Sequence, residues 1–339
     1  MANCNKLFLD FDKELNVLST KKSKLFLSAK NVRKAIRKHF NENHSDYIPK
    51  FAYQGSNELG TMIRTKEDTC DLDQGVYFFR QPDVEAKTLQ KWIFDSVENI
   101  TDTPSLHKNK CIRVIYAGDY HIDLPTYYKL KKDDDSDHPQ LAIKEDGFKE
   151  SDPLDFIKWF RKSSKHTPQL VRIIKDLKSW CDHVRNKMPS GLAMTILAEK
   201  YIQPNDRDDI TLRDTLKNIY EELNKKWACE MPSTPFDDLF KDFDANRKKN
   251  FLDHLKAFID NADIAIDKEK NQLAASKLWK KHLGFRFPEG ADEDIDAKEA
   301  ALRAMKVSIL GGVAKTNSAG KIQESSGVSH IKHSNYGGK

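Results

Sequence analysis

The sequence predicts an α+β protein in which a lobe built on a mixed β-sheet precedes a mostly helical lobe. Before residue 150, short β-rich runs bounded by turn residues alternate with amphipathic helical segments. From Asp152 onward, apolar residues recur at helical spacing almost throughout. The 339 residues are enough to bury a sizeable core in two closely joined lobes. We therefore assign residues 1–150 to a sheet lobe, 151–310 to a helical lobe and 311–339 to a flexible tail.

The sheet lobe begins with a helix predicted over residues 23–43, where apolar residues recur against a face of Lys and Arg. A strand over 47–53 and an amphipathic helix over 84–100 are expected next. The β-rich runs 113–116 and 120–124 flank a turn that contains glycine, and they predict a hairpin. In the second of these runs, alternation places the apolar residues on one face of the strand and the polar residues on the other.

Residues 129–150 are polar, and we expect them to form a solvated loop. Four clustered acids in this segment invite a calcium-site interpretation: Asp133, Asp134, Asp135 and Asp137. The regular ligand spacing and the glycine of a calcium-binding loop are missing, however. The solvated-loop interpretation is therefore preferred.

The helical lobe has recognisable start signals. Thr167 followed by Pro168 predicts an N-cap and a proline at the first helical position. A second helix is predicted to begin at Ser190, directly after Pro189. Further helices are expected at about 210–226, 235–262 and 263–283.

Two small residues, Gly55 and Ser56, follow the first predicted strand. Because glycine has no Cβ, the backbone there can come close to phosphate oxygens, and the Ser56 hydroxyl adds a donor. Asp71 and Asp73 lie two apart in the next β-rich run, so their carboxylates leave the same face of a strand. Asp123 adds a third carboxylate from a later strand.

Together the three acids predict a site for divalent cations. No basic partner is apparent beside them, so on apolar strands they would repel one another without a cation. Mg²⁺ prefers carboxylate and phosphate oxygens, and three carboxylates can hold two ions that clamp an in-line displacement. Taken singly, each motif has a plainer interpretation: the Gly-Ser pair as a turn, and the acids as solvated residues on a strand.

A Gly-Ser pair, then Asp-x-Asp, then a single Asp on a later strand resembles the DNA polymerase beta nucleotidyltransferase superfamily. Within it, the chain most resembles the cGAS/DncV-like nucleotidyltransferases of bacterial anti-phage signalling. This closer resemblance rests on three passages: Tyr53-Gln54-Gly55-Ser56, the segment 71–77, and Leu177-Lys178-Ser179-Trp180 with the segment 189–197. It covers roughly residues 10 to 310. It implies a polymerase-beta-like lobe with a long N-terminal spine helix, and an active site in the cleft between the lobes.

The resemblance also implies nucleotide-binding residues outside the carboxylates. Gln54, Gly55 and Ser56 would bind nucleotide, and Lys178 would reach the donor triphosphate with help from Ser190. The plainer interpretation makes the lysine a surface residue and the serine a helix cap.

Two neighbouring residues bear on this assignment. Lys175, one turn earlier on the same predicted helix, is the alternative to Lys178. Several members of the family stack the donor base on an aromatic residue directly after the serine, where this chain has Gly191. Recognition of the base must therefore come from elsewhere.

The implied activity is the metal-dependent joining of nucleoside triphosphates into a cyclic di- or trinucleotide second messenger, with release of pyrophosphate, in anti-phage defence. The expected substrates are ATP and a second nucleoside triphosphate, GTP or another. Two Mg²⁺ ions, or Mn²⁺, would be held by Asp71, Asp73 and Asp123, and Asp123 would align the attacking ribose hydroxyl. The alternatives are a linear RNA- or tRNA-tailing nucleotidyltransferase of the same superfamily and a catalytically silent nucleotide-binding scaffold.

Composition restricts the partners and the compartment. A net charge of +5 is compatible with a basic cleft for triphosphates but too small to argue for wrapping duplex nucleic acid. The 5 cysteines lack any C-x-x-C pairing, which predicts reduced thiols in a cytoplasmic protein. The zinc-ligand pattern of the family's animal DNA sensor is missing, which argues against activation by DNA. No stretch approaches the ~20 apolar residues of a membrane span, and the N-terminus lacks an apolar signal core.

After Leu310 the chain becomes rich in Gly, Ser, Lys and His. Such a segment buries too little apolar surface to order itself. In some operons of the resembling family, a ubiquitin-like conjugation system acts on the synthase through its C-terminal glycine. The run Tyr336-Gly337-Gly338 suggests a conjugation enzyme as a partner, although Lys339 follows where the glycine should be terminal.

Overall fold

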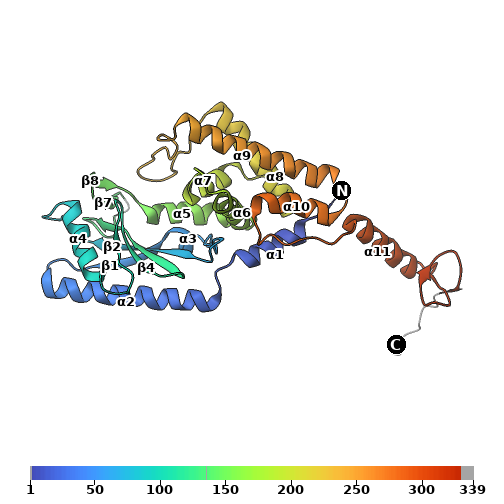
Figure 1. The fold of residues 1–339 in the computed structure, drawn as a ribbon, viewed down its shortest axis with the longest axis horizontal. Coiled ribbons are helices and arrows are strands. Elements are labelled where there is room, and N and C mark those ends of the chain that lie inside the picture. The colour runs from blue at the N-terminus through green and yellow to red at the C-terminus, as the bar shows by residue number, and fades with distance from the viewer. Residues whose placement is uncertain (1, 135, 330–339) are drawn as a thin grey trace.

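The computed structural model describes residues 2–134 and 136–329, and it confirms the α+β class. A sheet flanked by helices forms one lobe, a cluster of helices forms the other, and one long helix projects from the body (Figure 1). The helices are α1 (Asn5–Leu15), α2 (Ser19–Asn43), α3 (Gly55–Glu58), α4 (Ala86–Val97), α5 (Pro153–Ser164), α6 (Gln169–Val184), α7 (Gly191–Tyr201), α8 (Asp208–Lys225), α9 (Ala245–Asp263), α10 (Gln272–Leu283) and α11 (Ile295–Leu310). A π-helical turn, Ile264–Lys268, continues α9.

The large sheet is organised around its longest strand, β2. Its strands are β1 (Lys50–Gln54), β2 (Cys70–Phe78), β3 (Leu106–His107), β4 (Ile112–Tyr116), β5 (Tyr120–Leu124), β6 (Thr126–Tyr128), β7 (Gln140–Ile143) and β8 (Gly147–Glu150). The order is β3-β4-β5-β2-β6-β7-β8, and β1 also pairs with β2. β2 runs parallel to β5 and β6 and antiparallel to β1. The predicted hairpin is β4–β5.

One face of the sheet is apolar and is covered by α2 and α4. Leu72 and Val76 of β2 and Ile122 of β5 are fully buried there. They pack in one cluster with the apolar stripe of α2: Leu25, Ala29, Val32, Ile36 and Phe40. Because side chains alternate along a strand, the acids of β2 and β5 leave the opposite face. The predicted helix over 23–43 and the predicted orientation of Asp123 are confirmed.

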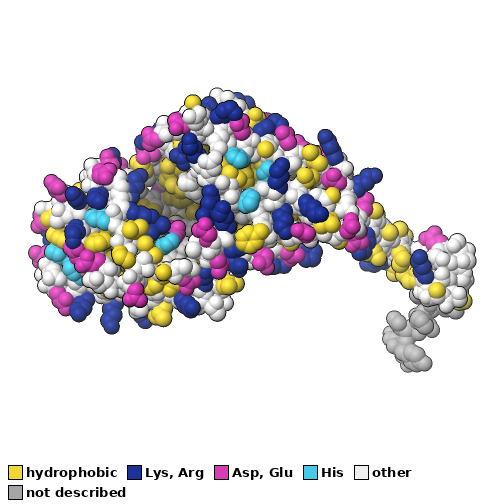
Figure 2. Space-filling view, in the orientation of Figure 1, with side chains coloured by type: hydrophobic (Ala, Val, Ile, Leu, Met, Phe, Trp, Pro, Cys, Tyr) yellow, Lys and Arg dark blue, Asp and Glu magenta, His cyan; other side chains and the backbone are white. Residues whose placement is uncertain are grey.

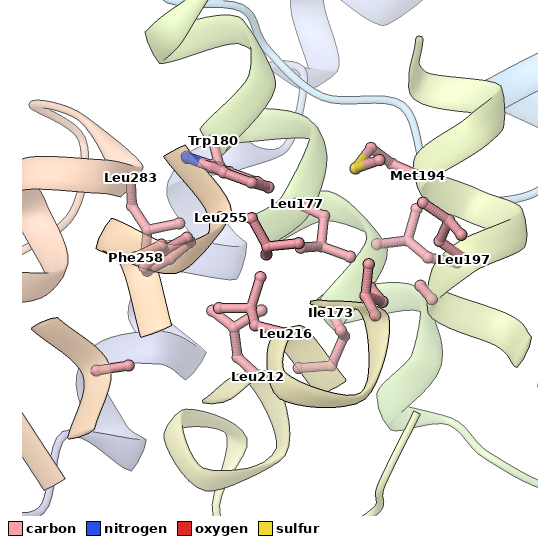
Figure 3. Close-up of a cluster of buried hydrophobic side chains, with 14 of the residues drawn as sticks. Ile173, Leu177, Trp180, Met194, Leu197, Leu212, Leu216, Leu255, Phe258 and Leu283 are labelled. Atoms are coloured by element: carbon pink, nitrogen blue, oxygen red, sulfur yellow. The ribbon is translucent and has the colours of Figure 1, made fainter. Parts of the chain in front are cut away.

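The helical lobe has its own core around α6. Figure 3 shows Ile173, Leu177 and Trp180 of α6 directed toward side chains from α7, α8, α9 and α10. The partners labelled there are Met194, Leu197, Leu212, Leu216, Leu255, Phe258 and Leu283, and all of them are buried. Each such side chain stabilises the fold by roughly 1.5–3 kcal/mol.

The first helix, α1, belongs to this helical core although it begins the chain. Phe8 makes an edge contact with Trp279 at 4.9 Å between ring centroids, and Phe11 makes one with Phe287 at 5.2 Å. Residues 16–18 then lead directly into α2, which packs on the sheet. The boundary at residue 150 stays a proposal, and the buried clusters place α1 with the later helices.

Several expected elements differ in the structure. The polar segment 129–150 contains the hairpin β7–β8, so the prediction of a loop throughout is wrong. The helix expected over 235–262 begins only at Ala245, because Asp244 caps it and a loop precedes it. The helix expected over 263–283 is interrupted at residues 269–271. α1 lies where the sequence led to no particular expectation of a helix, and α11 lies within the predicted helical lobe, beyond the last helix that was given bounds.

The tail is also not structureless where it is described. Three two-residue strands, β9 (Lys315–Thr316), β10 (Ile322–Gln323) and β11 (Val328–Ser329), form a small antiparallel sheet. Asp135 and the run Tyr336-Gly337-Gly338 with Lys339 lie outside the described residues. Among residues 2–134 and 136–329, none of the helices is both long enough and apolar enough to cross a bilayer.

Candidate active site

The register of β2 against β5 brings the three predicted carboxylates to one face of the sheet. Asp71 lies opposite His121, and Asp73 lies opposite Asp123. On the other side of β2, Gln54 at the end of β1 also pairs with Asp73. The chain then turns into α3, which places Gly55 and Ser56 beside the acids.

Gly55 is required by a close approach. Its φ is +64°, and a Cβ at this position would lie 2.0 Å from Oδ2 of Asp73. No larger residue fits without moving the carboxylate, and the left-handed backbone itself favours glycine. The sequence prediction invoked glycine for the approach of phosphate. The structure adds a second reason, which is contact with a neighbouring acid.

Asp73 is less accessible to solvent than Asp71, its neighbour two residues earlier on β2. Burial, followed by the negative charges of Asp123 and Asp71, raises the pKa of Asp73 from 3.8 to about 7. A carboxyl group with this environment is stabilised by any added positive charge. The electrostatics of the cluster therefore suit a cation.

Arg113 on β4 lies beside the predicted acids, and the sequence interpretation missed it. Its Nε and Nη2 donate to Oδ1 and Oδ2 of Asp123, each at 2.7 Å, and Nη2 lies 3.7 Å from Oδ2 of Asp71. His121 Nδ1 lies 2.9 Å from Oδ1 of Asp71. The expectation that the acids lack a basic partner is therefore wrong. The hydrogen bonds to Asp123 hold the pKa of Arg113 above its usual value, despite partial burial.

Lys178 reaches the same face from the helical lobe. Its Nζ donates to the carbonyl oxygen of Thr61 at 3.0 Å and to the Thr61 hydroxyl at 3.1 Å. Burial lowers the pKa of Lys178 from 10.5 to about 8, and the charge of Asp73 partly opposes this. A Cβ on Gly191 would lie 2.8 Å from Cε of Lys178, so this glycine leaves room for the lysine side chain.

A cavity of about 470 Å³ joins these groups between the two lobes. Seven of the eight predicted site residues line it: Gln54, Gly55, Ser56, Asp71, Asp73, Asp123 and Lys178. The helical lobe adds apolar wall residues, including Phe156, Leu192 and Met231. Figure 2 shows the molecule hollowed between the sheet lobe at the left and the helices above it. An adjoining cavity of about 410 Å³ shares Ser56, Asp71 and Lys178.

The remaining predicted residues are placed differently. Ser190 is the N-cap of α7, as the helix start predicted, and its Oγ accepts from the Ala193 N–H at 3.2 Å. It is not among the residues that line the two cavities. The Gln54 side chain bonds to the hydroxyls of Tyr77 and Tyr127. Lys175 faces away from the site, since its Nζ contacts Asp12 of α1 and Asn16, the C-cap of α1, at 2.9 Å each.

The donor set fits a hard divalent cation, with one qualification from the geometry. Among the described residues, no three His, Cys, Asp or Glu side chains converge on one point as a complete metal site. The carboxylate of Asp123 faces Arg113, and that of Asp71 faces His121. Mg²⁺ usually binds through one or two carboxylates together with substrate phosphates, so a protein-only cage is not required. The carboxylates of Asp71, Asp73 and Asp123 are therefore suitable ligands for a divalent cation that is also bound by substrate phosphates.

Comparison with known proteins identifies the domain and the fold. Residues 49–127 match the family model of the cyclic GMP-AMP synthase DncV-like nucleotidyltransferase domain. The structure resembles Vibrio cholerae DncV cyclic AMP-GMP synthase, described as a prokaryotic cGAS homolog, with a TM-score of 0.75 and 18% identity over 85% of this chain and 98% of that one. It also resembles Escherichia coli DncV bound to 3′-deoxy GTP, with a TM-score of 0.70 and 20% identity over 81% and 93% of the two chains.

A third similar structure carries nucleotides. It is a Vibrio cholerae DncV mutant in complex with ATP, GTP and 5MTHFGLU2, with a TM-score of 0.74 and 18% identity over 85% of this chain and 98% of that one. The similarity covers nearly the whole of each of these proteins. Sequence identities of 18–20% establish that the fold is shared, and the fold alone. The resemblance inferred from the sequence is confirmed by the domain match and the fold together.

Proposed function

We propose that this chain, which has a DncV-like nucleotidyltransferase domain and the DncV fold, is a metal-dependent synthase that joins nucleoside triphosphates into a cyclic di- or trinucleotide and releases pyrophosphate. ATP and a second nucleoside triphosphate are the proposed substrates. One observation carries the proposal: Gly55 and Ser56, the three aspartates and Lys178 line one cavity, although they come from two lobes. The structures of DncV with ATP and GTP support the choice of substrates.

Each residue has a physical role in this reaction. Gly55 lets the backbone approach the donor triphosphate, and Ser56 offers it a hydroxyl donor. Lys178, oriented by its two bonds to Thr61, adds a positive charge on the opposite wall. Asp123 would align the acceptor ribose hydroxyl and accept its proton. The hydroxyl oxygen then bonds to the α-phosphorus as the bond to pyrophosphate breaks.

Asp71, Asp73 and Asp123 would hold divalent cations, and we propose two Mg²⁺ ions, with Mn²⁺ as a substitute. When bound, such ions lower the pKa of the attacking hydroxyl and neutralise the triphosphate. The chain itself contributes mainly position and charge, since phosphoryl transfer needs little covalent work from the protein.

The test is incubation of the purified chain with labelled nucleoside triphosphates and Mg²⁺ or Mn²⁺, followed by phosphatase. A small product that resists phosphatase is the expected result. Extension of added RNA would instead support the linear tailing alternative. The absence of product with every nucleotide pair and metal would indicate a silent nucleotide-binding scaffold or a missing activator.

The aspartates provide the first mutational prediction. Asp71→Ala or Asp73→Ala should leave the circular dichroism spectrum unchanged and abolish product, because each removes a ligand from the cation site. Product made by either variant at the wild-type rate would contradict the metal assignment.

Several further parts of the proposal depend on the resemblance. We propose a role in anti-phage defence, action in the cytoplasm where the substrates are found, and a nucleotide contact from Ser190. We also propose that a ubiquitin-like conjugation enzyme acts on the C-terminal tail. Mass spectrometry of the tail from cells that contain the whole operon tests this last part, and an unmodified tail would count against it.

A further inference from the structure

We propose that Arg113 competes with divalent cations for the carboxylate of Asp123. When a metal ion binds, it replaces the Arg113 guanidinium as the partner of the Asp123 carboxylate. The inference rests on the proposed function, because it concerns the same three acids. It assigns a role to a residue that lies beside the proposed ligands and is not one of them.

The position of Arg113 follows from the hairpin. β4 and β5 pair so that Arg113 lies directly opposite Asp123, one strand further from β2. Both side chains therefore leave the face that carries Asp71 and Asp73. Only 21% of the arginine side chain and 14% of the Asp123 side chain are exposed, so solvent weakens their attraction little.

The contact engages the whole Asp123 carboxylate. Two parallel bonds of 2.7 Å join the guanidinium to both oxygens, which is the strong bidentate form of this pair. The same Nη2 lies 3.7 Å from Oδ2 of Asp71. One positive group thus lies beside two of the three acids that are proposed to hold metal.

A cation that binds these acids must overcome this arrangement. It must either draw the Asp123 oxygens away from Arg113 or accept a full positive charge beside it. Both effects lower metal affinity. The contrary role, in which the arginine orients a metal ligand as an outer partner, predicts that removing the arginine weakens metal binding by about 10–100-fold. The sign of the change in affinity separates the two roles.

The experiment titrates Mn²⁺ alone, without nucleotide, into the full chain and follows free Mn²⁺ by electron paramagnetic resonance. Arg113→Gln should lower the Kd for Mn²⁺ by about tenfold or more, since hydrogen bonds to a charged group no longer oppose the metal. The melting temperature in chelator should fall, because Asp123 loses its partner. Arg113→Lys keeps the charge but cannot make the two-pronged contact, so its Kd should lie between those of Arg113→Gln and the wild type.

Arg172→Gln is the matched control. Arg172 makes the same kind of bidentate contact with Asp208, at 2.5 and 2.9 Å, and neither residue lines the cavity. This variant should lose stability and keep the wild-type Kd for Mn²⁺. If Arg113→Gln does not fold, Arg113→Lys provides the test, and its Kd for Mn²⁺ should be lower than that of the wild type.

An unchanged or higher Kd in the Arg113 variants would overturn the inference, as would failure of both wild type and variants to bind Mn²⁺. Failure of the proposed function looks different. In that case the wild type makes no cyclic product, while the shift in Mn²⁺ affinity is still observed. Conversely, a wild type that makes product while the Kd does not move refutes only the inference about Arg113.

Discussion

Replacing Gly55 with alanine tests whether the backbone of the Gly-Ser turn fixes the position of Asp73. The new Cβ would lie 2.0 Å from Oδ2 of Asp73, in a residue whose φ is +64°. A left-handed backbone costs an alanine about 1–2 kcal/mol. Forcing the aspartate side chain off its rotamer adds about 0.5–1.5 kcal/mol. The total of about 1.5–3.5 kcal/mol corresponds to a fall in melting temperature of about 3–14 °C for lobes of this size.

Gly60→Ala is the matched control for this perturbation. Gly60 has a φ of +68°, and a Cβ there would meet nothing within 4 Å. It carries the backbone cost without the contact, so the difference between the two variants isolates the collision with Asp73. We expect Gly60→Ala to lose about 1–2 kcal/mol and to keep its activity.

The assay combines thermal denaturation with cyclic product formation. A displacement of about 1 Å at a reacting group can cost about a hundredfold in rate, so Gly55→Ala should lose at least that much activity while Gly60→Ala loses little. If the two glycine variants lose equal stability and equal activity, the contact with Asp73 has no role and the reasoning is refuted.

Further predictions concern charge in the same cavity. Because burial and neighbouring acids raise the pKa of Asp73 to about 7 in the folded protein, the folded state holds this proton more tightly than the unfolded chain does. Without metal, the free energy of unfolding should therefore fall as the pH rises from about 4 to about 7. Mg²⁺ should raise the melting temperature more at about pH 8, where Asp73 is ionised, than at about pH 5. An equal effect of Mg²⁺ at both pH values would contradict this prediction. Lys178→Met should reduce the rate of product formation by about a hundredfold or more without loss of helix content, since it removes a fixed positive charge from the donor site. Gly191→Ala, whose Cβ would lie 2.8 Å from Cε of Lys178, should raise KM for the donor triphosphate, and an unchanged KM would show that the lysine has room to move.

The sequence alone correctly predicted the features that depend on local periodicity. Alternation along 120–124 correctly placed Asp123 on the face opposite Ile122, and that face is where the cavity lies. The apolar stripe of α2 was equally local, because helical spacing shows it directly. These two patterns fixed the side of the sheet on which the acids meet.

Which residues face each other on neighbouring strands depends on the register of the hairpin. The turn at 117–119 sets the register of the hairpin, and counting outward from it places Arg113 opposite Asp123. The signal for the missed arginine was therefore present in the sequence. Its two-pronged contact with Asp123 still required the side-chain geometry.

Other differences depend on tertiary contacts that a local pattern does not contain. The polar segment 140–150 forms a hairpin because Leu141, Ala142 and Ile143 are buried against the rest of the sheet lobe. The region 235–244 has apolar residues at nearly helical spacing. The Asp238 carboxylate instead accepts from the backbone N–H groups of Cys229 and Phe240 and so stabilises a loop.

The packing of α1 determines how the protein could be divided. A fragment that began at α2 would lack Leu7, Phe8, Phe11 and Leu15, which are at most 9% exposed in the intact chain. At roughly 1.5–3 kcal/mol for each, that loss is comparable to the whole stability of a typical domain. The helical lobe is not one contiguous stretch of sequence, because α1 precedes the sheet lobe and the other helices follow it, so no single cut separates the two lobes. Truncated variants and fusion proteins must therefore retain the first eighteen residues, because without α1 the apolar core of the helical lobe would be exposed to solvent.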